Sequence, residues 1–103
     1  MVVTSSFQDE TLYITLSGEI GEQSVQSARS ECDKLIEEYS NAKKIIINLS
    51  KIKFMDSTGV GFLIGRQRRA LSFSIPVYLQ EPSPAADMIL NLSGLYSLIP
   101  KIE

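Results

Sequence analysis

The sequence predicts an α/β domain in which helices pack on a mixed sheet of about five strands. Three observations support this class. Leu12, Ile14 and Leu16 alternate with polar or aromatic neighbours, which is the period-two pattern of a half-buried strand. Residues 43–49 (KKIIINL) are rich in β-branched side chains, as in a buried strand. Strand-like and helix-like segments then alternate along the chain, which favours parallel pairing with right-handed crossovers.

The N-terminal segments predict an antiparallel hairpin at the sheet edge. Residues 2–7 alternate as a short strand, residues 8–10 form a turn, and the second strand ends at Gly18 before a loop over residues 19–22. A helix is expected over residues 22–39, because its apolar positions form one stripe: Val25, Ala28, Cys32, Leu35, Ile36 and Tyr39. Cys32 is interpreted as a small buried side chain rather than a reactive thiol.

Residues 43–49 follow, and we expect this strand to be central and covered on both faces. The next helix is expected over residues 59–70 and ends with Arg66, Arg68 and Arg69. These arginines either complement the helix dipole or form a patch for an acidic partner.

The last third predicts a strand over residues 75–80 that begins near Pro76. A helix follows over residues 84–93, with Ser83 as its N-cap and Gly94 as a left-handed C-cap. Its apolar positions are Met88, Ile89 and Leu92. Residues 96–102 are expected to form a last short strand.

Composition narrows the function classes. The chain has 103 residues, which predicts one domain over residues 1–103. Its net charge of −2 argues against a nucleic-acid partner or a membrane surface. With no histidine and one cysteine, it has little material for a metal site, a cofactor or nucleophilic catalysis, so we do not expect an enzyme. The lone cysteine, with no signal peptide or long apolar run, favours the cytoplasm.

Polar chemistry is concentrated at residues 54–61 (FMDSTGVG), between a strand-like and a helix-like run. Ser57 or Thr58 can serve as the N-cap of that helix. The same position suits a phosphoserine, because free N–H groups and the helix dipole favour an anion. A phosphate there would add charge beside Asp56, and beside Glu19 if the second strand ends nearby, and would repel a docked partner. The residues alone leave both interpretations open.

The glycines of this segment also have two interpretations. Residues 59–65 (GVGFLIG) follow a strand-like run, and Glu81 lies 22 residues after Gly59, as in a dinucleotide-binding turn. Against this, the carboxylate of Asp56 stands where a pyrophosphate would approach. The alternative is that Gly61 and Gly65, about one turn apart, let the helix approach the sheet closely.

Four segments resemble STAS domains, and specifically bacterial anti-sigma factor antagonists. They are residues 16–20 (LSGEI), 45–49 (IIINL), 54–61 (FMDSTGVG) and 91–95 (NLSGL). They occur in the family's order over nearly the whole chain, and the third is the most specific. The resemblance implies a STAS-like layered domain that acts by partner switching.

In that family, an anti-sigma factor that is also a serine kinase holds a sigma factor inactive. The unphosphorylated antagonist binds the anti-sigma factor and frees sigma. The kinase ends this binding by phosphorylating the serine after the aspartate, and a serine phosphatase reverses the modification. The resemblance therefore implies phosphorylation at Ser57. It implies a partner-binding surface formed by Glu19, Asp56, Thr58, Gly59, Val60 and Gly61.

The sequence departs from the family in two places. Relatives often have an acid soon after the Gly-Glu pair, where this chain has Gly21, and phosphorylation is expected to be weaker if that acid helps the kinase to engage. The chain also ends at Glu103 without the C-terminal helix usual in relatives. We expect either an exposed surface that favours a homodimer or a partner that covers it. A STAS scaffold or transport-associated protein, in which Ser57 is only a cap, is the alternative function.

Overall fold

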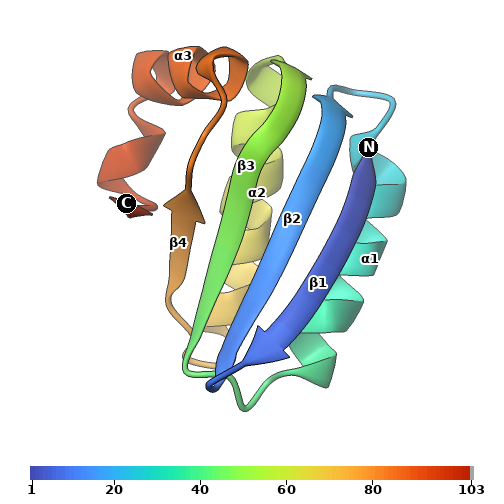
Figure 1. The fold of residues 1–103 in the computed structure, drawn as a ribbon, viewed down its shortest axis with the longest axis vertical. Coiled ribbons are helices and arrows are strands. Elements are labelled where there is room, and N and C mark those ends of the chain that lie inside the picture. Colours follow the sequence, from blue (N-terminus) through green and yellow to red (C-terminus); the bar gives the residue numbers. More distant parts are fainter. Residues whose placement is uncertain (103) are drawn as a thin grey trace.

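The structure, a computed structural model, describes residues 1–102 and alternates strands and helices in the predicted order. Figure 1 shows the sheet in front, α1 and α2 behind it, and α3 beside its upper end. The strands are β1 Val2–Gln8, β2 Thr11–Ile20, β3 Lys44–Met55, β4 Val77–Gln80 and β5 Lys101–Ile102. The helices are α1 Val25–Glu38, α2 Ser57–Leu71 and α3 Pro84–Ser93, followed by the 3₁₀ helix η1 Leu95–Ser97.

One five-stranded sheet has its strands in the order β1-β2-β3-β4-β5, so β3 is central, as expected. β1 pairs with β2 antiparallel and the other neighbours are parallel, which confirms the predicted mixed sheet and N-terminal hairpin. The hairpin turns at Asp9 and Glu10. Their φ angles of 51° and 63° are both positive, as a two-residue type I′ turn requires.

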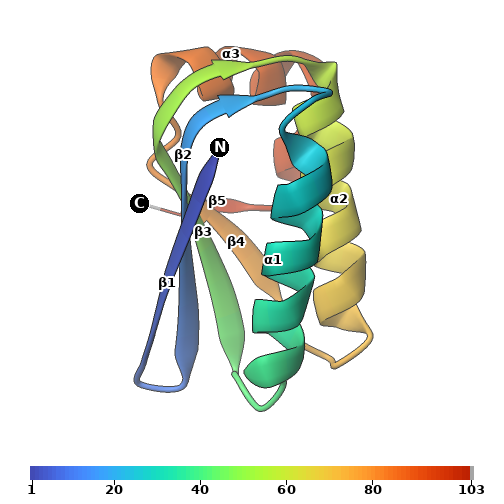
Figure 2. The ribbon, with the colours of Figure 1, turned by 90° about the vertical axis from the view of Figure 1, so that its right-hand side faces the viewer.

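Helices α1 and α2 cover one face of the sheet, and within residues 1–102 no helix covers the other face (Figure 2). The core-facing side chains of the two central strands are at most 2% exposed: Leu12, Ile14, Leu16, Ile45, Ile47 and Leu49. The expectation that β3 is covered on both faces is therefore met by helices on one face only. On the outer face Ile46 is still only 4% exposed, and it lies in register between Tyr13 and Tyr78, which flank it in place of a covering layer.

The second strand continues past Gly18, where the sequence predicts its end. β2 and β3 pair in parallel until Ile20 lies opposite Met55. Register shifts on either side of residues 17–18 mark bulges, and Gly18 has a φ of +100° that suits glycine. Residues 19–20 are therefore strand rather than loop, because pairing with β3 outweighs the local tendency of glycine to end a strand.

The caps of α3 are as predicted. The Ser83 hydroxyl accepts a hydrogen bond from Ala86 N at 3.2 Å, and Gly94 ends the helix with a φ of 74°. The buried residues of α3 differ from the prediction, however, because Ala86 and Leu90 face the core. Met88 and Leu92 are 61% and 80% exposed.

Two boundaries near the C-terminus also differ from the sequence prediction. β4 begins at Val77, after Pro76, whose carbonyl accepts a hydrogen bond from Ile45 N at 2.9 Å. Residues 96–102 do not form one strand, since η1 precedes the two-residue β5. Local bonding is the reason, because Leu98 N and Ile99 N both donate to the carbonyl of Leu95.

α1 begins at Val25, three residues later than predicted, and buries one stripe toward the sheet and α2: Val25, Ala28, Cys32 and Ile36. Cys32 is 2% exposed, and burial raises the pKa of its thiol to about 12. Its interpretation as a buried side chain is confirmed.

Two of the three arginines of α2 pair with α1 instead of forming a patch for a partner. Arg66 is 6% exposed, its Nε lies 2.9 Å from Asp33 Oδ1, and its guanidinium stacks 5.0 Å from the centre of the Phe62 ring. Arg69 pairs with Glu37 at 2.7 Å. Burial lowers the pKa of Arg66, and the carboxylate of Asp33 opposes that shift. The pair therefore holds a buried charge that ties the middle of α2 to α1.

Replacing Asp33 by asparagine is expected to lower the free energy of unfolding by about 3 kcal/mol, because the buried Arg66 charge loses its counter-ion. The matched control Glu37→Gln removes the more exposed Arg69 pair and should cost less than about 1 kcal/mol. Urea unfolding of the two variants and the parent chain measures both effects. Equal losses in the two variants would contradict this role of Arg66.

Candidate functional site

The junction between β3 and α2 is organised by Asp56. Its backbone is extended, with φ −108° and ψ −174°, and its Oδ1 accepts a hydrogen bond from Thr58 N at 2.9 Å. The Thr58 hydroxyl donates to the same oxygen. Asp56 is therefore the N-cap of α2. The prediction that Ser57 or Thr58 serves as the cap is wrong, because the carboxylate one residue earlier already takes the free N–H group.

Ser57 occupies the first helical position and is exposed. Among residues 1–102 its hydroxyl has no hydrogen-bond partner, whereas the hydroxyl of Thr58 is bonded to Asp56 and half-buried. The two hydroxyls that the sequence places side by side thus differ in availability. Only that of Ser57 faces solvent unpaired.

The end of β2 anchors this junction. Asp56 N donates to the carbonyl of Ile20 at 3.2 Å. Glu19 lies in register with Phe54, two residues before Asp56, and is exposed. The structure therefore brings Glu19 to the same end of the sheet as Ser57, as the sequence analysis allowed. The extension of β2 beyond Gly18 is what places it there.

The turn between β2 and α1 closes against Asp56. A Cβ atom on Gly21 would lie 3.3 Å from Asp56 Oδ2, so this position faces the capping carboxylate directly. The Ser24 hydroxyl accepts a hydrogen bond from Gly21 N at 3.0 Å and lies 2.9 Å from the carbonyl of Glu19, to which it can donate. An acid in place of Gly21 would bring a second carboxylate against Asp56. Gly21 leaves that space open.

A hollow of about 280 Å³ lies beside the junction, between the β2–α1 turn and β3. It is lined by Glu19, Gly21, Glu22, Gln23, Ser24 and Phe54. Phe54 is 49% exposed, and the sequence analysis, which included it in residues 54–61, did not count it among the partner-binding residues. With Asp56 adjacent, this side of the site presents carboxylates around an exposed aromatic ring, which suits a partner with cationic or aromatic groups.

Gly59 is the glycine that permits close packing. A Cβ on it would lie 2.6 Å from Met55 Cγ and 3.1 Å from Ile20 Cγ2, both side chains being buried. A Cβ on Gly61 or Gly65 would meet nothing within 4 Å, so the interpretation that these two bring the helix close to the sheet is wrong. Because Gly59 is itself buried, it can act on a partner only by positioning the first turn. Gly61 is exposed and Val60 half-buried.

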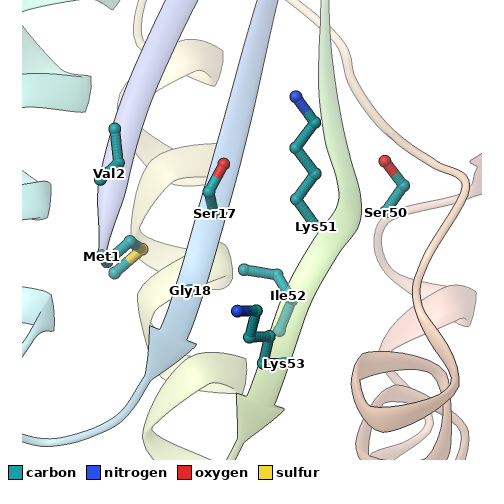
Figure 3. A pocket seen from close by; sticks show the side chains of 8 residues that line it. All are labelled: Met1, Val2, Ser17, Gly18, Ser50, Lys51, Ile52 and Lys53. Carbon is teal, nitrogen blue, oxygen red and sulfur yellow. The ribbon is translucent and has the colours of Figure 1, made fainter.

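A second hollow is remote from the glycines of residues 59–65. It has a volume of about 580 Å³ on the outer side of the sheet, and its lining includes Lys51 and Lys53 of β3 and Ser17 of β2 (Figure 3). Gly59 lines neither this hollow nor the one beside the junction, so neither of them supports the dinucleotide hypothesis. Within residues 1–102, no three His, Cys, Asp or Glu side chains gather as metal ligands, and no helix is long and apolar enough to cross a membrane.

Comparison with known proteins agrees with this architecture. The model of the STAS domain matches residues 3–103. An anti-sigma F factor antagonist of Lysinibacillus sphaericus is 35% identical over 86 residues, which are 84% of this chain and 73% of the relative. The anti-sigma factor antagonist SpoIIAA in its unphosphorylated form has a TM-score of 0.79 at 28% identity, over 99% of this chain and 89% of that one. Bacillus SpoIIAA in the phosphorylated form has a TM-score of 0.70 at 28% identity, over 99% and 92%.

A mixed sheet with helices on one face, and a helix that starts at an acidic, hydroxyl-rich junction after the central strand, is the architecture of the STAS class. The chain belongs to the STAS domain family, within the anti-sigma factor antagonists that SpoIIAA represents.

The capping geometry predicts that substituting Asp56 lowers the stability of the protein and that substituting its neighbour Ser57 hardly changes it. Asp56→Ala is expected to lower the free energy of unfolding by about 1 kcal/mol through loss of the N-cap, and Asp56→Asn to retain most of it. Ser57→Ala should change it by less than about 0.5 kcal/mol, because the Ser57 hydroxyl bonds to nothing in residues 1–102. Chemical denaturation measures the three values. A loss on Ser57→Ala as large as on Asp56→Ala would restore Ser57 as the cap.

The packing at Gly59 predicts a second contrast. Gly59→Ala should destabilise the protein, because overpacking against Met55 costs about 1–3 kcal/mol and outweighs the ~1 kcal/mol that alanine gains in a helix. The control Gly61→Ala, in open space, should stabilise it by up to about 1 kcal/mol. Thermal unfolding measures the change in stability of each variant. If both variants are stabilised or both are destabilised, the close approach at Gly59 is contradicted.

Proposed function

We propose that this chain is an anti-sigma factor antagonist that is switched at Ser57: it binds an anti-sigma factor serine kinase while Ser57 is unphosphorylated and releases it after phosphorylation. One observation carries the proposal. The Ser57 hydroxyl is exposed and unpaired in residues 1–102 because Asp56 supplies the N-cap. A kinase can reach such a hydroxyl without breaking the helix start. A serine phosphatase would return the chain to its binding form.

The electrostatics of the junction favour release after modification. A phosphoserine adds about −1.5 to −2 charge at neutral pH. Glu19, Glu22 and Asp56 already surround this end of the sheet. The N-terminal dipole of α2 tolerates the added anion, so the fold can remain while the docking surface becomes strongly negative and hydrated. A partner that fits the uncharged serine would then lose contact.

The proposed docking surface consists of Ser57 and the residues around it that reach the surface: Glu19, Asp56, Thr58, Val60 and Gly61. Gly59 contributes by holding the first turn against Met55. Phe54 joins this surface as an exposed ring.

Two further lines support the proposal. SpoIIAA, which is 28% identical to this chain, exists in unphosphorylated and phosphorylated forms. The alternative of a STAS scaffold or transport-associated protein gives Ser57 the role of a cap, and Asp56 already fills that role. Because such a switch acts on cellular transcription, we place the protein in the cytoplasm.

The test uses the cognate kinase with ATP. Mass spectrometry should find one phosphate on Ser57, and phosphorylation should weaken binding to the kinase by about a thousandfold, equivalent to ~4 kcal/mol. Ser57→Ala should bind constitutively and accept no phosphate. Ser57→Asp should bind more weakly, because its charge partly replaces the phosphate. Isothermal titration calorimetry measures the affinities.

Two control variants complete the experiment. Ser50→Asp places the same charge on an exposed serine of β3 and should bind like the parent chain. Thr58→Val removes the neighbouring hydroxyl and should still be phosphorylated at Ser57. Equal affinities of Ser57→Ala and Ser57→Asp for the kinase would reject the switch.

A further inference from the structure

The hollow on the outer side of the sheet, here called the outer hollow, differs in charge from the hollow beside the junction. That hollow is lined by two glutamates, and so is a third hollow between β1 and α1. Within residues 1–102, the lining of the outer hollow contains two lysines and no carboxylate. Its volume of about 580 Å³ lies within the roughly 300–1,000 Å³ that is typical of small-molecule sites. It is lined by Met1, Val2, Ser17, Gly18, Ser50, Lys51, Ile52 and Lys53.

The pairing of β3 with β2 is irregular where the two lysines lie. β3 has one residue more than β2 just before Lys51, and a second register shift, after Gly18, leaves Lys53 without a partner in β2. Bulges are over-represented at sheet edges and next to functional sites, where they re-aim a side chain. Because β3 is the central strand, an edge position does not explain these bulges. The irregular pairing therefore favours a functional role for this part of the sheet.

The polar groups of the outer hollow are free to bind a ligand. Figure 3 shows the Lys51 and Lys53 side chains between β2 and β3, with Ser17 on the β2 side. Within residues 1–102, the ion pairs belong to other cations, and neither lysine ammonium nor the Ser17 hydroxyl has a hydrogen-bond partner. Ser50 differs, because its hydroxyl donates to Asn48 Oδ1 at 2.6 Å. The outer hollow thus offers two positive charges and one free hydroxyl.

We propose that the outer hollow binds a small organic phosphate, a molecule with a dianionic phosphate group and an apolar body. Like phosphoserine, a phosphate monoester carries about −1.5 to −2 charge at neutral pH, which matches two ammonium groups better than one carboxylate does. The apolar body would contact Met1, Val2 and Ile52. Val2 is 60% exposed, so the ligand would remove an apolar side chain from water. This inference goes beyond the switch at Ser57 and does not depend on it.

The kind of cation indicates how the phosphate is held. Arginine fixes a phosphate through two parallel hydrogen bonds, whereas lysine acts as a flexible point charge. Within residues 1–102 no arginine lines the outer hollow, so the phosphate is held by charge rather than by a fixed geometry. We therefore expect moderate affinity that falls as salt is added, because ionic strength screens exposed charges. The apolar body supplies the rest of the binding free energy.

The test uses phenyl phosphate, which has both parts of the proposed ligand. Titration of the full chain at millimolar concentration, followed by nuclear magnetic resonance, should shift the amide signals of Ser17, Gly18 and Ile52 in a saturable way. Inorganic phosphate lacks the apolar body and benzyl alcohol lacks the charge. Each should therefore bind at least about tenfold more weakly than phenyl phosphate.

Variants of the lysines separate this site from the general charge of the protein. Lys51→Gln and Lys53→Gln should each weaken the binding of phenyl phosphate about tenfold, because each removes one charge-assisted contact. The matched control Lys44→Gln removes the same charge from the other end of β3 and should bind like the parent chain. All three lysines are exposed, so circular dichroism should show every variant folded.

Three results would overturn the proposal. The first is a parent chain whose amide signals show no saturable shift with phenyl phosphate. The second is a loss of binding in Lys44→Gln as large as in Lys51→Gln, which would assign the effect to general charge. The third is inorganic phosphate or benzyl alcohol that binds as tightly as phenyl phosphate.

Discussion

The hydrogen bond from Thr58 N to the carboxylate of Asp56 determines where α2 begins, and the geometry of the candidate site follows from it. Asp56 is held in turn by its own N–H group, which donates to Ile20 at the end of β2. Asp56 thus fixes the start of α2 to the sheet, because its side chain caps the helix and its backbone N–H bonds to β2. Because Asp56 satisfies the free donor of the first turn, Ser57 has no structural duty there, and its hydroxyl can be modified without loss of a cap.

The rest of α2 is held firmly enough that a charge change at its start need not move it. The first turn packs closely against Met55 because Gly59 has no side chain. The middle of the helix is tied to α1 by the buried Arg66–Asp33 pair. Overpacking costs about 1–3 kcal/mol and a broken buried ion pair about 3–5 kcal/mol, whereas an anion at a helix start gains about 0.3–1 kcal/mol. Under the proposed function, phosphorylation therefore changes the potential of the surface more than its shape.

Local physics made much of the fold predictable. Alternation revealed β2, the β-branched run revealed β3, and Ser83 and Gly94 marked both ends of α3. The wrong predictions are those in which contacts between distant parts of the chain determine the structure. Pairing with β3 extends β2 past Gly18, and the packing of α3 leaves Leu92 exposed to solvent. At the site, sequence located the junction and its serine. It could not assign the cap between three adjacent oxygen-bearing side chains, nor see Gly21 facing Asp56, because both depend on how β2 and β3 end together.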